Sequence, residues 1–214
     1  MNLSAIESAL VKVQRDFPHI NASLTASRDP LTDEVVANML SAYRRVDYYL
    51  EKGVDLFGLG ESERLLELNA LVLCGDSSHQ PEPSGVRAAA NARQFYETEA
   101  GGVGGLMEWL DLHRKDSVWK RAAGVFTRVL SRPQLYVEGN HRTGTLLMSY
   151  LLAREGRPPF VLTVDNARLF FEPATVIKKR KKHGLDNLWR LPKLTSRFAR
   201  LLEEQADSHF LDRH

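Results

Sequence analysis

The sequence predicts an all-α fold, a helical bundle with at most a small β-hairpin, and three observations support this prediction. In nearly every long segment, apolar residues recur at intervals of three and four, which is the spacing of one helix face. Glycines and prolines divide these segments where helices are expected to end. A chain of 214 residues supplies one good-sized core but is short for two, so we expect residues 1–214 to form a single domain.

The N-terminal half is expected to contribute three amphipathic helices. They begin behind Asn2, behind Thr32 and at Ser62, and the third is expected to end near Gly75. Residues 76–85, which read DSSHQPEPSG, contain two prolines and little apolar surface. This composition predicts a long loop, and a loop of this length in a compact domain usually has a function, such as contact with a substrate.

Two consecutive helices are expected at the centre of the bundle. The helical pattern of residues 118–130 ends before Pro133, and residues 146–152 are apolar on nearly all sides, as in a central helix. Gly156 is placed to end the second of these helices. The loop that joins them is therefore held between two buried elements.

The charge balance does not favour a polyanionic partner. Lys and Arg number 29 against 27 Asp and Glu, which gives a net charge of +2. The basic run 178–183 is short and has no interleaved aromatic residues, so it is more typical of a solvated helix face than of a nucleic-acid site.

Cysteine content and hydropathy bear on the compartment. The only cysteine is Cys74, which excludes an intramolecular disulfide and fits a buried, inert thiol in a reducing compartment. Residues 1–20 contain no uninterrupted signal-peptide core, and no run approaches the ~18 apolar residues of a membrane span. We expect a cytoplasmic protein without a membrane partner, or one exported as an effector without a cleavable signal peptide.

The loop between the two central helices carries the residues expected to do chemistry. Residues 134–145 read QLYVEGNHRTGT, and residues 138–145 are predicted to bind phosphate at the start of the second helix. Gly139 permits a backbone conformation that other residues resist, and Asn140 is a good N-cap residue. Free backbone N–H groups at a helix start attract anions. Arg142 opposes the helix dipole there by ~0.3–1 kcal/mol, so a bound phosphate explains it better than helix stability does.

Glu138 extends this prediction to a metal ion. A carboxylate is a hard oxygen ligand suited to Mg²⁺, and beside a phosphate site it indicates a magnesium nucleotide. The alternative is that Glu138 pairs with Arg142 and that the loop is only a well-capped helix start. The spacing matches neither the Walker loop nor the dinucleotide-binding glycine motif.

The segment resembles the signature of the Fic (Fido) family, His-x-Phe-x-Asp/Glu-Gly-Asn-Gly-Arg-x-x-Arg. The corresponding residues here are Gln134, Tyr136, Glu138, Gly139, Asn140, His141, Arg142 and Thr145. The resemblance covers about residues 65–171, with helical extensions at both ends. It implies a Fic-like helical bundle in which residues 76–96 form a small β-hairpin flap that docks a target protein.

The resemblance also implies a function. Fic proteins bind ATP or another nucleotide with Mg²⁺ and transfer a phosphate-containing group, most often AMP, to a hydroxyl of another protein. Carried over to this sequence, Glu138 would hold the metal, Arg142 would neutralise the phosphates, and Tyr136 would anchor the loop in the core. The nucleotide and its phosphates would contact Gly139, Asn140, His141, Arg142, Thr143, Gly144 and Thr145.

Besides Tyr136 in the place of Phe, three positions depart from the family pattern. Gln134 replaces the catalytic His, and because an amide is not a base at neutral pH, transfer should be slow or absent. General-base catalysis typically contributes ~10²–10⁴ in rate. Thr145 replaces the second Arg. His141 replaces the second Gly and could be a displaced base or phosphate donor, since a His beside an anion site can change protonation near neutral pH, or it could simply fill space.

Glu67, in the sequence Glu-Leu-Asn, is weakly similar to the inhibitory Glu-Gly-Asn of the family. No Ser or Thr stands four residues before it, and without the second Arg it has nothing to clamp. Two hypotheses remain open. The first is a divergent Fic-like transferase. The second is a pseudoenzyme that senses a nucleotide or binds a partner through residues 76–96. A homodimer is compatible with either.

Overall fold

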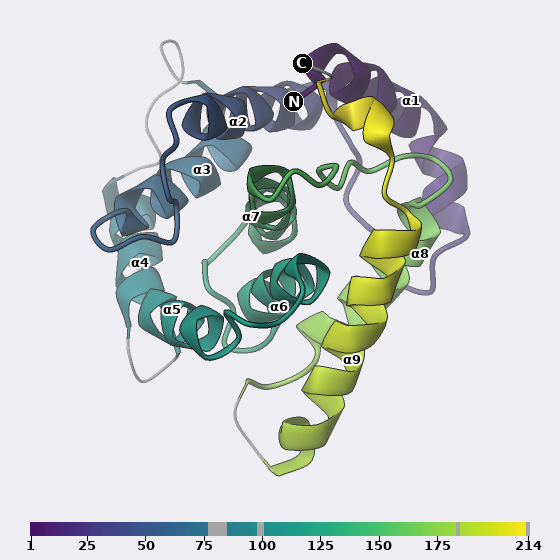
Figure 1. The fold of residues 1–214 in the computed structure, drawn as a ribbon. Helices are drawn as coiled ribbons and strands as arrows, with labels where there is room; N and C mark the ends of the chain where they lie inside the picture. The colour runs from purple at the N-terminus through teal and green to yellow at the C-terminus, as the bar shows by residue number, and fades with distance from the viewer. Residues whose placement is uncertain (77–84, 98–100, 183–184, 213–214) are drawn as a thin grey trace.

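The computed structural model describes residues 1–76, 85–97, 101–182 and 185–212. In these residues every regular element is a helix, which confirms the all-α prediction (Figure 1). The elements are α1 (Leu3–Ala22), α2 (Asp33–Glu51), α3 (Ser62–Cys74), α4 (Gly85–Tyr96), α5 (Val103–Leu112), α6 (Val118–Leu130), α7 (Asn140–Arg154), α8 (Ala167–Lys178), α9 (Leu185–Glu204) and the 3₁₀ turn η1 (Ser208–Phe210).

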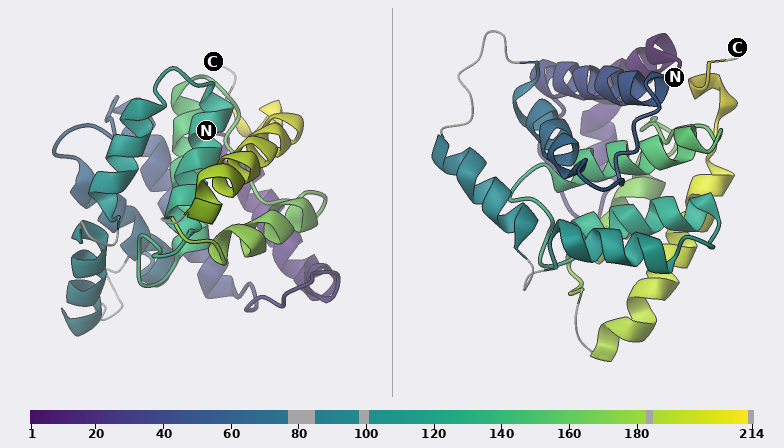
Figure 2. Two further views of the ribbon diagram at one scale, coloured as in Figure 1. Left: turned by 90° about the horizontal axis from the view of Figure 1, so that it is seen from below. Right: turned by 60° about the vertical axis from the view of Figure 1, so that its left-hand side comes forward.

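Helices α6 and α7 pack together at the centre, and the other helices surround them (Figures 1 and 2). Helices α2 and α3 cover one side, α4 and α5 a second, and α8 and α9 a third. Helix α7 is buried on nearly all sides from Thr143 to Leu152, as its sequence predicts. The start of α7 is thus fixed in the middle of the molecule.

The helix ends follow local sequence signals. Asn2 accepts a hydrogen bond from the Ala5 N–H at 3.1 Å, and Thr32 accepts one from the Val35 N–H at 3.3 Å. Helix α3 ends at Gly75 with φ +70°, a left-handed value that glycine adopts most readily. The caps at Asn2 and Thr32 and the stop at Gly75 agree with the sequence prediction.

The predicted hairpin flap is wrong for the part of 76–96 that the structure describes. Gly85–Tyr96 forms helix α4, while 77–84 lies outside the described residues. Within the described chain, β-type pairing is limited to one isolated bridge between Arg132 and Lys181. Three consecutive alanines, 88–90, explain the helix because alanine has the highest helix propensity.

Helix α5 packs on α6 through the indole of Trp109. The ring lies against Gly124 so closely that a Cβ at this position would overlap it. Trp109 also stacks on His113 at 4.1 Å between ring centroids, and the Arg128 guanidinium lies 5.9 Å from the indole. The absence of a side chain at 124 therefore sets how closely the two helices approach.

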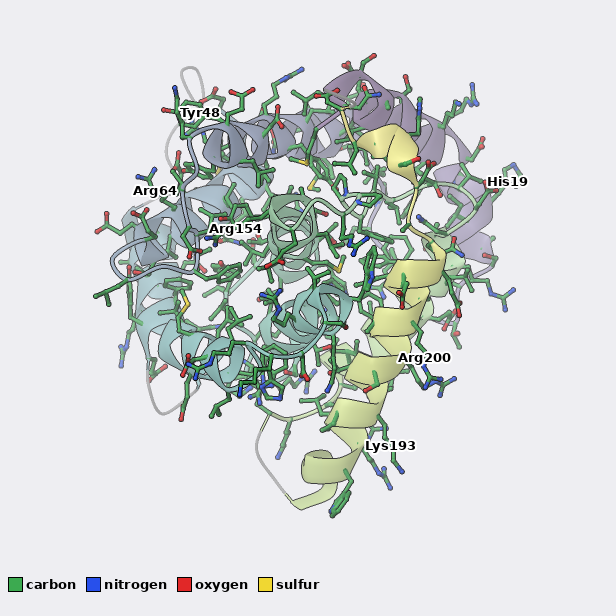
Figure 3. The ribbon with its side chains drawn as sticks, in the orientation of Figure 1. His19, Tyr48, Arg64, Arg154, Lys193 and Arg200 are labelled. Carbon is green, nitrogen blue, oxygen red and sulfur yellow. The ribbon has the colours of Figure 1, made fainter. Side chains whose placement is uncertain are left out.

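Helix α9 has one buried and one exposed face. Its Leu191, Phe198 and Leu202 are buried, and Phe198 stacks on Phe126 of α6 at 4.9 Å. Lys193 and Arg200 point outward from the opposite face (Figure 3). None of the helices in the described residues is both long and apolar enough to cross a membrane.

The basic run 178–183 divides between two environments in its described part. Lys178 and Lys179, at the end of α8, are exposed. The ammonium of Lys182 is largely buried and donates to the Gly101 carbonyl at 3.2 Å, and this burial lowers the pKa of Lys182 to about 8. The run is therefore a solvated surface only in part.

Candidate functional site

Tyr136 anchors the loop between α6 and α7. Its side chain is fully buried, its hydroxyl donates to the Leu65 carbonyl at 3.1 Å, and its ring stacks on Phe95 at 5.4 Å. Burial raises the pKa of the Tyr136 hydroxyl well above its usual value, so the group stays protonated as a donor. This is the anchoring role that the family resemblance implies for Tyr136.

Asn140 closes the loop by bonding to the Tyr136 backbone and not, as the sequence predicts, by capping α7. Gly139, with φ +74°, is the N-cap residue, and Asn140 is the first residue of α7. The Asn140 side chain accepts from the Tyr136 N–H at 2.9 Å and donates to the Tyr136 carbonyl at 2.7 Å. The expectation of Asn140 as N-cap is therefore wrong, because its amide already closes the preceding turn.

A chain of side-chain amides holds the loop from the other side. Asn69, fully buried on α3, donates to the Glu138 carbonyl at 3.0 Å and to the Thr143 hydroxyl at 2.9 Å. Its own oxygen accepts from Asn91 of α4 at 2.8 Å, and Asn91 accepts from the Val137 N–H at 3.0 Å. These two asparagines were not predicted from the sequence, although Asn69 is a polar residue within the apolar face of α3.

A cavity of about 580 Å³ opens beside the first turn of α7. Most of the predicted segment lines it, namely Gln134, Glu138, Gly139, Asn140, His141, Arg142 and Thr145. Thr143 and Gly144 do not, because they face the core. The Thr143 hydroxyl is bonded to Asn69, and a Cβ on Gly144 would lie 3.1 Å from the Phe126 ring. The structure therefore separates these two residues from the other predicted contacts.

The backbone of the first turn supplies free donors. The first helical bond runs from the Thr143 N–H to the Gly139 carbonyl at 2.9 Å. The N–H groups of residues 140–142 precede it and have no helical acceptor. Such groups, with the positive end of the helix dipole, favour an anion.

Arg142 is half-buried at the cavity wall. It donates to the Val72 carbonyl in the last turn of α3, and no carboxylate of the described residues lies within ion-pair distance of it. The alternative Glu138–Arg142 ion pair is therefore not formed. Burial lowers the pKa of the Arg142 guanidinium, which the nearby charges of Glu138, Asp29 and Glu34 oppose. An arginine still keeps its charge in such a site.

Arg28 and Lys178 bring two further cations to the same cavity. Arg28 belongs to the segment that joins α1 to α2, and its Nη1 lies 3.1 Å from Nε2 of His141. Lys178 comes from the end of α8. No motif or period marks Arg28 in the sequence, whereas Lys178 was visible only as part of the basic run.

His141 is neutral in this environment. Burial lowers its pKa to about 3, and the charges of Arg28 and Lys178 act in the same direction. Since an arginine can only donate, Nε2 of His141 is the acceptor and Nδ1 carries the proton. These surroundings oppose protonation near neutral pH, and a role of His141 in proton transfer stays a prediction.

The remaining predicted residues differ in accessibility. The side-chain amide of Gln134 donates to the Leu130 carbonyl at 3.3 Å, and the backbone carbonyl of Gln134 accepts from the side chain of Gln94 on α4 at 2.8 Å. Thr145 is buried and donates to the His141 carbonyl at 2.9 Å. Glu138 is exposed at the cavity. Glu67 does not line the cavity, because it accepts from the Tyr49 hydroxyl and is ion-paired to Arg45.

The donor set allows a metal only together with a ligand. Within the described residues, no three His, Cys, Asp or Glu side chains cluster as a metal site would require. Among the described residues, the carboxylates that line the cavity are Glu138 and Asp29, beside its cations. Mg²⁺ is commonly held by one or two carboxylates plus the phosphate oxygens of a substrate, so Glu138 fits that arrangement if the ligand carries phosphate.

No protein-family model matches the sequence, and a comparison with curated proteins finds no match. Among solved structures, the chain is similar to a Fic domain containing signaling protein from Bacteroides thetaiotaomicron. The TM-score is 0.51 at 16% sequence identity, and the match covers 94% of this chain and 88% of the other. The chain therefore has a Fic-like helical fold.

Proposed function

We propose that this protein binds a magnesium nucleotide in the cavity beside α7, and that it transfers a group from it weakly or not at all. The observation that carries the proposal is Arg142, a half-buried guanidinium on the cavity wall with no carboxylate of the described residues paired to it. Burying an uncompensated charge is costly, and a phosphate group would offset that cost.

The electrostatics of the cavity support an anionic ligand. Three cations line it, against the two carboxylates Asp29 and Glu138; the cations are Arg142, Arg28 and Lys178. The N–H groups of residues 140–142, which have no helical acceptor, lie in the adjoining turn. Hydrogen bonds between arginine and phosphate are about twice as strong as neutral ones. Glu138 would share Mg²⁺ with phosphate oxygens, and the bound metal would neutralise part of the phosphate charge.

The other walls suit an organic group attached to the phosphate. They are apolar and partly aromatic, formed by Leu10, Phe17, Leu31, Val35, Met39, Tyr43, Leu162, Phe170 and Phe171. A mostly apolar cavity with a few placed polar groups is typical of small-molecule sites, and about 580 Å³ is within their usual range. A base and ribose would lie against these walls while the phosphates meet the cations.

The site lends little support to group transfer. Moving a phosphate-containing group to a hydroxyl requires a base to take the hydroxyl proton. Gln134 has no basic atom, and the Nε2 lone pair of His141 faces Arg28. Loss of a general base costs ~10²–10⁴ in rate, so nucleotide binding is expected to outlast catalysis. A target or partner protein would dock over 76–96, where α4 contacts the loop.

Calorimetric titration tests the binding. Wild type and Arg142→Gln would be titrated with ATP, GTP, CTP and UTP, each with and without Mg²⁺. We expect one nucleotide to bind wild type in a metal-dependent way and Arg142→Gln to bind at least tenfold more weakly. Arg121→Gln is the control, since Arg121 is ion-paired to Glu155 and does not line the cavity. Failure of all four to bind wild type would refute the proposal.

Transfer is tested with radiolabel. Label from α- or γ-labelled ATP would be followed onto lysate proteins for wild type, Gln134→His and Arg142→Gln. We expect little label with wild type and more with Gln134→His, because the variant restores a base at the family position. Strong labelling by wild type that disappears in Arg142→Gln would instead identify a transferase.

A further inference from the structure

Arg28 is held in place from both its backbone and its side chain. The Asn21 side chain accepts from the Arg28 N–H at 2.8 Å and donates to its carbonyl at 3.1 Å. The guanidinium donates to the Phe171 carbonyl at 3.0 Å and to the Thr175 hydroxyl at 2.5 Å, and it lies 5.1 Å from the centre of the Phe171 ring. A side chain restrained in this way loses little entropy on meeting a ligand.

The charge of Arg28 has no close counterion among the described residues. Asp29 and Glu172 are near enough to favour the charged form, but neither lies within ion-pair distance. Glu172 instead accepts from the Thr25 N–H at 2.7 Å. Nε of Arg28 is buried without a hydrogen-bond partner in the described chain. Neutral acceptors thus meet only part of the hydrogen-bonding capacity of this cation.

Arg28 lies beside the first turn of α7, at the cavity. Arg28 contacts His141, and the Thr145 hydroxyl one turn further along bonds to the carbonyl of the same His141. Arg142 is bonded to α3, whereas Arg28 is bonded to α8. The cavity therefore receives guanidinium groups from two different walls.

We infer that Arg28 is the second phosphate-binding cation of the site, and that the ligand carries at least two phosphate groups. The inference rests on the proposed function. Because Thr145 stands where a second Arg would be, α7 does not supply the second cation, and the α1–α2 segment supplies it through Arg28. Arg142 and the free N–H groups of the first turn bind one phosphate, and Arg28 binds the next. A monophosphate engages only one of these two positions.

A purely structural role for Arg28 gives different expectations. As a tether between the α1–α2 segment and α8, it would affect stability and would change the affinity for every ligand equally. As a phosphate ligand, it selects for the number of phosphates. The ratio of diphosphate to monophosphate affinity is therefore the discriminating quantity.

The test is titration of AMP, ADP, ATP and inorganic tripolyphosphate into wild type, Arg28→Gln, Arg28→Lys and Thr175→Val, with thermal unfolding of each. We expect Arg28→Gln to weaken ADP, ATP and tripolyphosphate at least tenfold and AMP less than threefold. Arg28→Lys keeps the charge and should retain most of the affinity. Thr175→Val loosens the tether without removing charge and should leave the ratio unchanged. Arg15→Gln, an exposed arginine of α1, is the matched control.

Two results would overturn the inference. One is that folded Arg28→Gln binds ADP and tripolyphosphate as wild type does. The other is that it loses AMP and ADP equally. Binding of tripolyphosphate that depends on Arg28, with no nucleotide bound by wild type, would refute the nucleotide proposal and leave this inference standing.

Discussion

The first turn of α7 has a side that faces the core and a side that faces the cavity, and the two differ in whether their polar or charged groups are paired within the protein. On the core side, the Thr143 hydroxyl has a hydrogen-bond partner within the protein, and Gly144 packs on a ring of α6. On the cavity side, Arg142 is a cation with no acidic partner among the described residues, and Arg28 of the α1–α2 segment, which contacts His141, is another.

The difference shows that a short motif can serve structure with some of its residues and binding with others. A helix turn points successive side chains to different faces, so neighbours in sequence need not share a task. The core side should respond to substitution in stability, and the cavity side in ligand affinity. Predictions for Tyr136, Asn69, His141 and Lys178 test that division, in order of decreasing expected effect.

Tyr136→Ala should destabilise the protein most, by about 3–5 kcal/mol, because it removes a fully buried ring from the core. Tyr136→Phe removes only the bond to the Leu65 carbonyl and should cost ~0.5–1.5 kcal/mol. Guanidinium denaturation measures both. A cost below about 1 kcal/mol for the alanine variant would contradict the anchoring role.

Asn69→Ala should cost about 1–3 kcal/mol, since it leaves the Glu138 carbonyl and the Thr143 hydroxyl without their donor. Asn91→Ala should cost less, because Asn91 is only half-buried and water can replace its bonds. Urea unfolding compares the two variants. Equal costs would mean that the buried end of the amide chain matters no more than the accessible end.

His141 should make stability depend on pH. Its folded pKa of about 3 lies below the ~6.5 of an unfolded His, so only the unfolded state takes up the proton between these values. The stabilisation is complete above pH 6.5 and is lost as pH falls toward 3. Between pH 7 and pH 5 the loss is about 2 kcal/mol.

The free energy of unfolding, measured at pH 7 and at pH 5 for wild type and His141→Gln, gives this pH-dependent loss of stability. The glutamine variant should lack it. His19→Gln, at an exposed residue that points away from α1 (Figure 3), should keep the wild-type difference. A His141→Gln protein with the full wild-type pH dependence would show that His141 is not held neutral.

Lys178→Gln should have the smallest effect. Lys178 is exposed, so stability is expected to change by no more than ~0.5 kcal/mol. Ligand affinity should fall less than in Arg28→Gln or Arg142→Gln, and by an amount that shrinks at high salt. Titration at two salt concentrations checks this. A loss as large as that of Arg142→Gln would place the principal cation on α8 instead.

Local patterns accounted for most of the fold. The caps at Asn2 and Thr32 and the stop at Gly75 depend on neighbouring residues, so they were readable in the sequence. The hairpin flap at 76–96 was implied by the family resemblance, whereas the alanines at 88–90 favour the helix that residues 85–96 form. Where those two disagreed, local propensity was correct for the described part of the segment.

Only the part of the candidate site that lies in one continuous segment was predictable from the sequence. The motif loop and Arg142 stand in one segment, and backbone freedom, charge and the family pattern all pointed to it. Arg28 lies 113 residues away from His141 in the sequence and carries no periodic or motif signal. Which side chains of a loop meet a distant helix is decided by tertiary packing, and a single sequence does not contain that contact in readable form.

The contact between Trp109 and Gly124 has a consequence for protein engineering. Replacing a mid-helix glycine by alanine is a common stabilising change, worth ~0.5–1 kcal/mol where there is room. In α6 the same replacement would displace the indole and separate α5 from α6, so the gain becomes a loss. Gly104 and Gly105, on α5 itself, have open space around a new Cβ. Thermostabilisation of this scaffold should therefore begin on α5 and leave the glycine of α6 unchanged.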